Sequence, residues 1–197
     1  MKKITEIISG RRSFSERFIP DFDELKEVVE RLKYEGKTIV LISGVYDLIH
    51  IGHARFLEMG KQHGDILIVG VDSDELTKIR KGPSRPLVPE QERVEMLSHL
   101  RHVDIITLYK PKQDNFECIE KIKPHKIIIS ETTKDIKPEM LEQIEKYKIE
   151  KILLPAQAKV STTERYRQIT MDGGKELGEK ITAVIENHLN PKEDGKT

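Results

Sequence analysis

Five short apolar runs, separated by segments with helical periodicity, constrain the fold of this chain more than any other feature of its sequence. The runs are continuous rather than alternating in polarity, as in strands that helices cover on both faces of a parallel sheet. Strands are predicted at 38–43, 66–71, 104–108, 126–130 and 151–154. Helices are predicted at 52–63, from about 73, and at 89–100, 114–122, 138–147 and 161–169. The alternation predicts an α/β fold with a doubly wound, mainly parallel five-stranded sheet, in which ligands bind beyond the carboxyl ends of the strands.

Two further helices flank this pattern. Apolar residues recur at helical spacing from Phe22 to Leu32 until Gly36 ends the pattern, so a helix is predicted over 22–35. A last helix is predicted after Gly173-Gly174, to about residue 188. The predicted organisation is therefore an N-terminal extension with one helix at 1–36, an α/β domain at 37–170, and a C-terminal helix and tail at 171–197.

Composition narrows the classes of partner. Lysine plus arginine equals aspartate plus glutamate at 34 each, so no net charge recruits nucleic acid or an anionic membrane. No stretch approaches the ~20 apolar residues of a membrane span. Cys118 is the single cysteine of the sequence and cannot form an internal disulfide, which fits a reducing compartment. A cytoplasmic protein without nucleic-acid or membrane partners is predicted.

The segment after the first predicted strand carries the strongest chemical signal. A turn at Ser43-Gly44 leads to His50-Ile51-Gly52-His53 at the start of a helix. A helix N-terminus offers unpaired N–H groups and a positive dipole end, which suit a phosphate. Two imidazoles three residues apart lie on one face of that first turn. The alternatives are that the histidines only cap the helix or fill space, or that they bind a transition metal; no third ligand has a motif around it, so no metal ligands are predicted.

The two common nucleotide-binding fingerprints, G-x-G-x-x-G and G-x-x-x-x-G-K-[ST], are absent from the sequence. Four ordered blocks, at 42–57, 64–74, 81–86 and 161–163, instead resemble the signature of the cytidylyltransferase-like, HIGH-motif nucleotidyltransferases. The resemblance spans about residues 38–170. It implies a Rossmann-like fold, and the transfer of a nucleoside monophosphate from ATP or CTP to a phosphorylated small molecule with release of pyrophosphate.

The resemblance also implies roles for individual residues. The implied catalytic residues, which would stabilise charge on the transferred and leaving phosphates, are His50, His53, Lys81 and Arg93. The implied nucleotide-binding residues are Ser43, Gly44, Val45, Tyr46, Asp47, His50, His53, Ser161, Thr162 and Thr163. Each has a plainer interpretation: Lys81 and Arg93 as surface charges, Ser161 as a helix N-cap, and Asp47 as a group that holds its own turn.

The acceptor region departs from the family pattern. Relatives place a glycine and an aspartate after the strand that corresponds to 126–129, where this chain has Ser130-Glu131. Arg85, Ser130 and Glu131 are the candidate acceptor-binding residues. The segment 81–86 is closer to the adenylyltransferase branch that acts on heptose 1-phosphate, which favours ATP and a sugar phosphate. Two alternatives stay open: a CTP-dependent enzyme of the glycerol-3-phosphate type, and a non-catalytic nucleotide-binding regulator or scaffold.

Two more expectations concern the cofactor and the assembly. Mg²⁺ is expected to be carried on the triphosphate with most of its ligands as water. A homodimer is predicted because this family commonly pairs its core domains and because the helix at 22–35 carries more apolar positions than an isolated surface helix needs. The same helix could equally pack on its own subunit.

Overall fold

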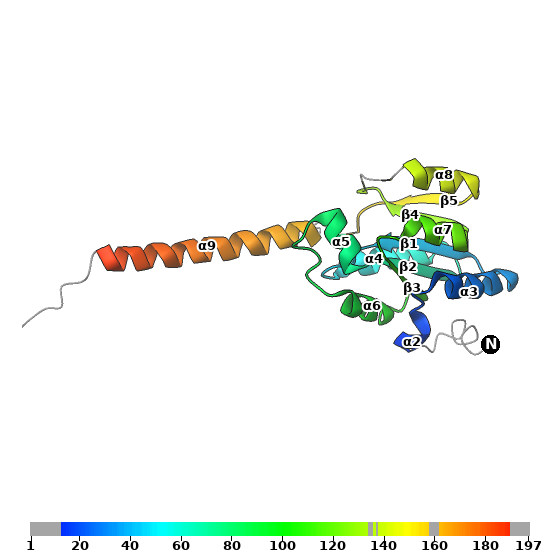
Figure 1. The fold of residues 1–197 in the computed structure, drawn as a ribbon, viewed down its shortest axis with the longest axis horizontal. Coiled ribbons are helices and arrows are strands. Elements are labelled where there is room, and N and C mark those ends of the chain that lie inside the picture. The colour runs from blue at the N-terminus through cyan, green and yellow to red at the C-terminus, as the bar shows by residue number, and fades with distance from the viewer. Residues whose placement is uncertain (1–12, 134–135, 137, 158–161, 190–197) are drawn as a thin grey trace, which may run out of the picture. The chain divides into compact units, whose positions relative to one another are not determined.

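A five-stranded sheet forms the centre of the protein. The computed structural model describes residues 13–133, 136, 138–157 and 162–189. The chain divides into two compact units, Met1–Ala158 and Lys159–Thr197, which are described separately. In the first, the strands are β1 (Ile39–Gly44), β2 (Ile66–Asp72), β3 (Ile105–Tyr109), β4 (Lys126–Ser130) and β5 (Glu150–Leu154). All neighbouring strands are parallel, in the order β3-β2-β1-β4-β5, which confirms the predicted fold class (Figure 1).

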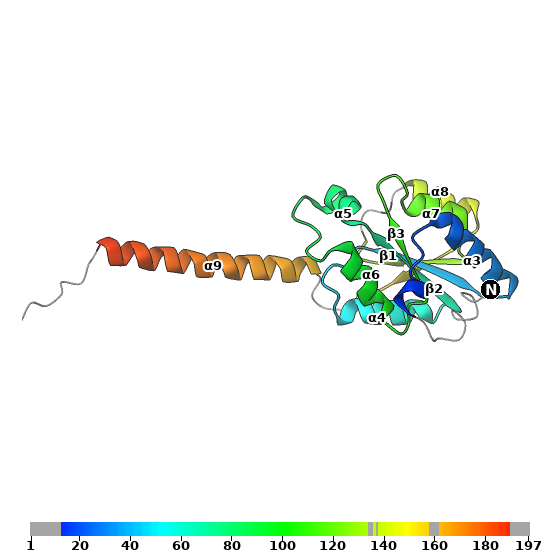
Figure 2. The same cartoon turned by 60° about the horizontal axis from the view of Figure 1, so that its bottom comes forward.

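Helices cover both faces of the sheet, as the continuous apolar runs predict. The first unit contains α2 (Phe14–Arg17), α3 (Phe22–Tyr34), α4 (Ile51–Lys61), α5 (Asp74–Lys81), α6 (Glu90–Ser98), α7 (Asn115–Ile122) and α8 (Pro138–Lys146). Successive residues of β1 belong to different apolar clusters: Ile39 and Leu41 pack with α3 and α7, and Val40 and Ile42 with α4 and α6 (Figure 2). Since each cluster covers one face, strand β2 is buried along its whole length.

The N-terminal extension packs against the sheet domain. The predicted helix at 22–35 is α3, and Asp21 caps it by accepting hydrogen bonds from the Asp23 and Glu24 amides at 2.9 and 2.8 Å. The apolar side of α3 is buried in the same cluster as β1 and α7. The extension also contains the short helix α2 and a parallel bridge from Phe18 to Ile106, where a single helix was predicted. The apolar face of α3 is therefore buried within its own subunit.

The second unit corrects one prediction. Its helix α9 runs from Thr162 to Leu189 without interruption, so the predicted break at Gly173-Gly174 is wrong. A helical glycine costs about 1 kcal/mol relative to alanine, which weakens a helix without ending it. The structural units divide at 158/159, whereas the domain boundaries at 36/37 and 170/171 stay predictions. Within the described part of the chain, no helix combines the length and the apolar character that a membrane crossing requires.

Candidate active site

The carboxyl end of β1 lies where the order of the strands reverses. β1 pairs with β2 on one side and with β4 on the other, so the site falls at the position where doubly wound sheets bind ligands. Beyond β1 the backbone turns sharply, because Tyr46 and Leu48 both adopt left-handed conformations with φ of 56° and 50°. Such conformations cost of order 1 kcal/mol or more and are found at functional sites. The turn delivers His50 to the N-terminus of α4.

His50 and His53 cap helix α4 together. The His50 Nδ1 atom accepts a hydrogen bond from the Gly52 amide at 3.0 Å, and His53 Nδ1 accepts from the His50 amide at 3.3 Å. The two rings lie with their centroids 4.1 Å apart. Since each Nδ1 acts as an acceptor, each neutral ring carries its proton on Nε2. The capping role weighed from the sequence is therefore present, and both Nε2–H groups belong to rings that lie at the positive end of the helix.

His53 is a neutral donor at pH 7. Burial, and to a smaller extent the neighbouring His50, lower the pKa of His53 to about 4 against the opposing effect of Asp47. The ring also packs against buried Tyr46, with the centroids 5.6 Å apart. Before an anion binds, His53 supplies an N–H group and no positive charge.

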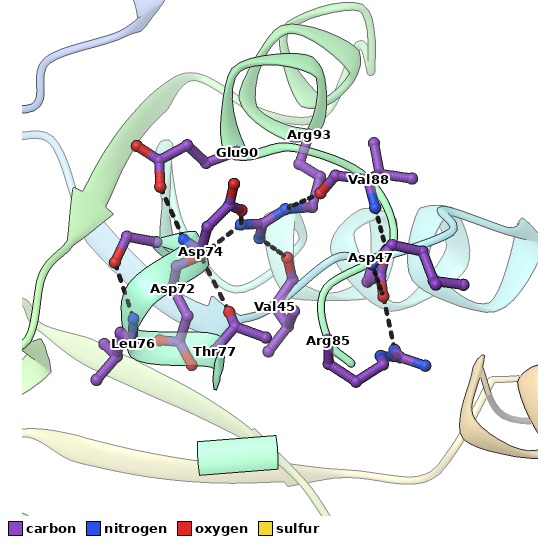
Figure 3. Close-up of polar contacts among 12 residues, drawn as sticks. Val45, Asp47, Asp72, Asp74, Leu76, Thr77, Arg85, Val88, Glu90 and Arg93 are labelled. Atoms are coloured by element: carbon purple, nitrogen blue, oxygen red, sulfur yellow. Dashed lines mark hydrogen bonds and ion pairs between the residues drawn. The ribbon is translucent and has the colours of Figure 1, made fainter. Parts of the chain in front are cut away.

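Arg93 is enclosed by three loops (Figure 3). The family resemblance implied a contact with phosphate instead. The residue is only 1% exposed. Its Nε donates to the Val88 carbonyl at 2.9 Å, and its Nη1 donates to the Val45 carbonyl. Nη2 donates to the Asp72 carbonyl at 2.9 Å and to Asp74 Oδ1 at 2.8 Å. The guanidinium therefore ties the loops after β1 and β2 to the segment before α6, and this places Arg93 in a positioning role.

Asp47 and Arg85 form a second tie beside Arg93. The Asp47 carboxylate accepts from the Leu87 amide at 3.0 and 3.1 Å and from the Val88 amide at 3.0 Å, and it pairs with Arg85 Nη2 at 2.8 Å (Figure 3). Both Asp47 and Arg85 are buried. These contacts match the plainer interpretation of Asp47 and hold the 82–88 loop against the histidine loop. They also turn the Arg85 guanidinium toward Asp47, and the contact of Arg85 with an acceptor stays a prediction.

Lys81 ends α5 instead of beginning the following loop, which starts at Gly82 with φ of 98°. The Lys81 residue is exposed. Its charge acts on Asp72, whose pKa is raised by burial against the opposing pull of Arg80, Arg93 and Lys81. A cation on a long, flexible stem thus lies beside the carboxyl end of β2.

A cavity of about 210 Å³ opens at the carboxyl ends of β1, β2 and β4. Its lining combines hydroxyl, amide and paired charged groups with an apolar wall, from Ser43, Gly44, Phe56, Asp72, Arg80, Asn115, Ile127, Ile128, Ile129, Ser130, Thr133, Ile136 and Met140. Of the predicted acceptor residues, Ser130 lines this cavity. Glu131 is exposed outside the lining, and its amide donates to the Leu154 carbonyl at 3.0 Å.

Arg80 and Asn115 line the cavity, although neither was among the site residues predicted from the sequence. Arg80 Nη1 contacts both carboxylate oxygens of Asp72 at 3.0 and 2.9 Å, and its Nη2 lies 3.4 Å from Asn115 Oδ1. The charges of Arg80 and Asp72 balance, so the cavity itself favours an uncharged group. Arg80 could have been noticed as the neighbour of Lys81, and Asn115 as the first helical residue after a strand's carboxyl end.

The triphosphate hydroxyls predicted at 161–163 belong to the second unit. Ser161 lies outside the described residues, and Thr162 begins α9. Their contact with phosphate stays a prediction.

Fold and site together define a class of protein. The first unit is a doubly wound α/β domain with the N-terminus of α4 and its two histidines at the switch point, cationic side chains on the neighbouring segments, and a small mixed cavity at the same end of the sheet. This is the arrangement of a protein that binds a phosphorylated nucleotide next to a second small molecule.

Comparison with known proteins identifies the family. The sequence profile described as Cytidylyltransferase-like matches residues 41–172, so the chain belongs to the cytidylyltransferase-like family of nucleotidyltransferases. It is 38% identical over 116 residues to "Bifunctional protein HldE" of a Nitratiruptor species, covering 59% of this chain and 25% of that protein. It is 42% identical over 101 residues to "Bifunctional protein HldE" of Desulfatibacillum aliphaticivorans, covering 51% of this chain and 20% of that protein. The chain thus spans a quarter or less of the length of these relatives.

Solved structures agree with the family. A lipopolysaccharide core biosynthesis protein from Thermoplasma volcanium superposes with a TM-score of 0.53 at 27% identity, covering 61% of this chain and 97% of that one. Pantothenate synthetase from Thermus thermophilus has a TM-score of 0.50 at 12% identity, covering 71% of this chain and 61% of that one, which shows the shared fold alone.

Proposed function

We propose that this chain transfers the adenylyl group of ATP to a phosphorylated sugar or polyol and releases pyrophosphate. The observation that carries the proposal is the His50–His53 pair, which presents two Nε2–H donors at the N-terminus of α4. The names of the relatives support a sugar phosphate as acceptor, since one similar structure is described as a lipopolysaccharide core biosynthesis protein.

The chemistry follows from the charges of the reactants. A phosphate monoester has a second pKa of about 6, so its attacking oxygen is already anionic near pH 7 and needs no general base. That oxygen forms a bond to the α-phosphorus of ATP as the bond from this phosphorus to the bridging oxygen breaks, and pyrophosphate leaves. The protein has to align two anions and stabilise the charge on the α-phosphate and leaving group. His50 and His53 serve the α-phosphate, and Lys81 bridges donor and acceptor.

A divalent cation would be carried by the triphosphate. Among the described residues, no three histidine, cysteine, aspartate or glutamate side chains are grouped to hold a metal. The carboxylates of Asp47 and Asp72 are engaged by Arg85 and Arg80. Mg²⁺ fits this environment because it keeps several water ligands and uses phosphate oxygens for the rest. It would supply charge neutralisation on the β- and γ-phosphates.

The cavity is the proposed site of the acceptor's uncharged body. Its hydroxyl and amide groups suit the hydroxyls of a sugar, and the apolar wall suits its C–H faces. Acceptor choice is therefore assigned to Arg80, Asn115 and Ser130, with Glu131 outside the contact.

The test is a pyrophosphate-release screen of the four nucleoside triphosphates against heptose 1-phosphate, other sugar phosphates and glycerol 3-phosphate, with Mg²⁺ present. We expect turnover with ATP and heptose 1-phosphate, and weak turnover with CTP and glycerol 3-phosphate. Efficient reaction of CTP with glycerol 3-phosphate would instead assign the chain to the cytidylyltransferase alternative. Nucleotide binding by calorimetry without pyrophosphate release for any pair would assign it to the non-catalytic regulators.

A further inference from the structure

The side chain of Tyr109 reaches from β3 across β2 to the active-site end of β1. Its hydroxyl oxygen lies 3.1 Å from the Ser43 hydroxyl oxygen. Gly70 makes the path possible: it is the register partner of Ser43 on β2, and a Cβ atom there would lie 2.1 Å from the Tyr109 hydroxyl. The ring therefore crosses the neighbouring strand where that strand has no side chain.

The Tyr109 side chain is packed inside the domain. Tyr109 is completely buried, and its ring meets the Phe22 ring of α3 edge to face, with the centroids 6.1 Å apart. The buried Cys118 of α7 belongs to the same apolar cluster as Tyr109. Burial raises the pKa of Tyr109, and it raises that of Cys118 to about 12, so both groups keep their protons at neutral pH.

The hydrogen atoms available decide which hydroxyl donates in the hydrogen bond between Tyr109 and Ser43. A phenol has one hydrogen to donate and an oxygen that accepts, and a buried donor without a partner costs free energy. Among the described residues, the hydrogen-bond partner of the buried Tyr109 hydroxyl is Ser43 Oγ, so the phenol hydrogen points to this atom. The Ser43 hydroxyl hydrogen is then directed away from Tyr109, and Ser43 is an exposed residue that lines the cavity.

We propose that Tyr109 is a positioning residue that orients the Ser43 hydroxyl as a hydrogen-bond donor to the ligand in the cavity. The proposal rests on the proposed function in taking that ligand to be the acceptor, and it assigns Ser43 to the acceptor instead of to the nucleotide, with which the family resemblance grouped it. It also gives the N-terminal extension a part in the site, because α3 supplies the Phe22 ring that holds the phenol.

The first test is structural and needs no activity. Crystal structures of the wild type and of Tyr109→Phe are compared for the Ser43 rotamer. We expect one Ser43 rotamer in the wild type and at least two in Tyr109→Phe. Thr107→Val is the matched control, because Thr107 is a buried residue of the same strand and its hydroxyl has no hydrogen-bond partner among the described residues. A single unchanged Ser43 rotamer in Tyr109→Phe overturns the proposal.

The second test is kinetic, with ATP and heptose 1-phosphate. Tyr109→Phe should raise the KM for heptose 1-phosphate about five- to tenfold, and leave kcat and the KM for ATP within about twofold. Ser43→Ala should have the same effect, the double variant should add little, and Thr107→Val should match the wild type. Equal losses for both substrates, or additive effects of the two substitutions, overturn the positioning role.

The two proposals fail in different ways. A wild-type protein that releases no pyrophosphate contradicts the proposed function, and the Ser43 rotamer still decides the role of Tyr109. A wild type that turns over normally while Tyr109→Phe behaves like Thr107→Val contradicts the role of Tyr109 alone.

Discussion

At the scale of single residues, the histidine pair combines a structural and a chemical task. Each Nδ1 satisfies a backbone amide of α4, and each Nε2 retains a proton for the ligand. Asparagine is also a good N-cap acceptor, so it separates the two tasks. A substitution to asparagine keeps a hydrogen-bond acceptor near the backbone and removes the imidazole N–H.

We expect His50→Asn and His53→Asn to keep the fold and to lower turnover by about 10²–10³, the usual loss for a preorganised donor to transition-state charge. The affinity for ATP should fall much less. Steady-state kinetics and calorimetry measure the two effects, and His63→Asn, beyond the other end of α4, is the control. Near-normal turnover in either variant would remove that histidine from the catalytic residues.

The lowered pKa of His53 makes stability depend on pH. The folded pKa of about 4 lies below the ordinary value of 6.5, so between these values the unfolded chain binds more protons. Folding stability from this group is complete above pH 6.5 and is lost as the pH falls toward 4. We expect the free energy of unfolding of His53→Asn, from urea titrations at several pH values, to fall less steeply over that window than that of wild type or His63→Asn. Equal slopes in all three proteins would show that His53 titrates normally.

At the scale of the elements, Arg93 and Asp47 make one frame out of separate loops. Arg93 joins the ends of β1 and β2 to the segment before α6, and Asp47 adds the 82–88 loop (Figure 3). The frame fixes the position of the histidine loop relative to the C-terminal end of α5, where Lys81 lies. Lysine cannot replace arginine here, because it is a point charge without the planar fork that serves several carbonyls at once.

We expect Arg93→Lys to lower the free energy of unfolding by about 2 kcal/mol, since at least one buried carbonyl loses its donor, and to lower turnover with it. Thermal and urea unfolding measure the first effect. Arg101→Lys is the control, because the Arg101 side chain is 81% exposed and should change stability by less than about 0.5 kcal/mol. Wild-type stability together with weakened nucleotide binding would instead indicate the direct phosphate contact inferred from the sequence.

At the scale of the whole molecule, the interface of the predicted homodimer is not explained by α3. Its apolar residues are buried against the sheet of the same subunit, so the surplus of apolar positions that suggested an interface is used internally. The prediction of a dimer now depends on the family resemblance alone.

We expect light scattering at micromolar concentration to give twice the monomer mass. Lys26→Glu reverses a half-exposed charge on the outer side of α3 and should leave that mass unchanged, because the interface is expected on another element. A monomer mass for the wild type rejects the dimer, and dissociation caused by Lys26→Glu would return the interface to α3.

The sequence by itself determined the fold class and pointed to the place of the candidate site. Continuous apolar runs are compatible with little other than strands covered on both faces, so the parallel sheet and the helices of the first unit other than α2 followed from local pattern. The histidine motif belongs to one turn of helix, so its geometry was also local. The uninterrupted α9 was missed because the cost of two glycines in a helix is small enough for the rest of the helix to outweigh it.

Only the tertiary structure decided which contacts form between side chains that are far apart in the sequence. The partners of Arg93 and Arg85 within the protein could not be predicted, because a sequence does not reveal which carbonyls and carboxylates will surround a guanidinium in the folded state. The contact between Tyr109 and Ser43 joins residues 66 positions apart across an intervening strand. Burial is set by the packing of the whole domain, and burial decides whether a charged or polar group meets a ligand or a neighbouring loop.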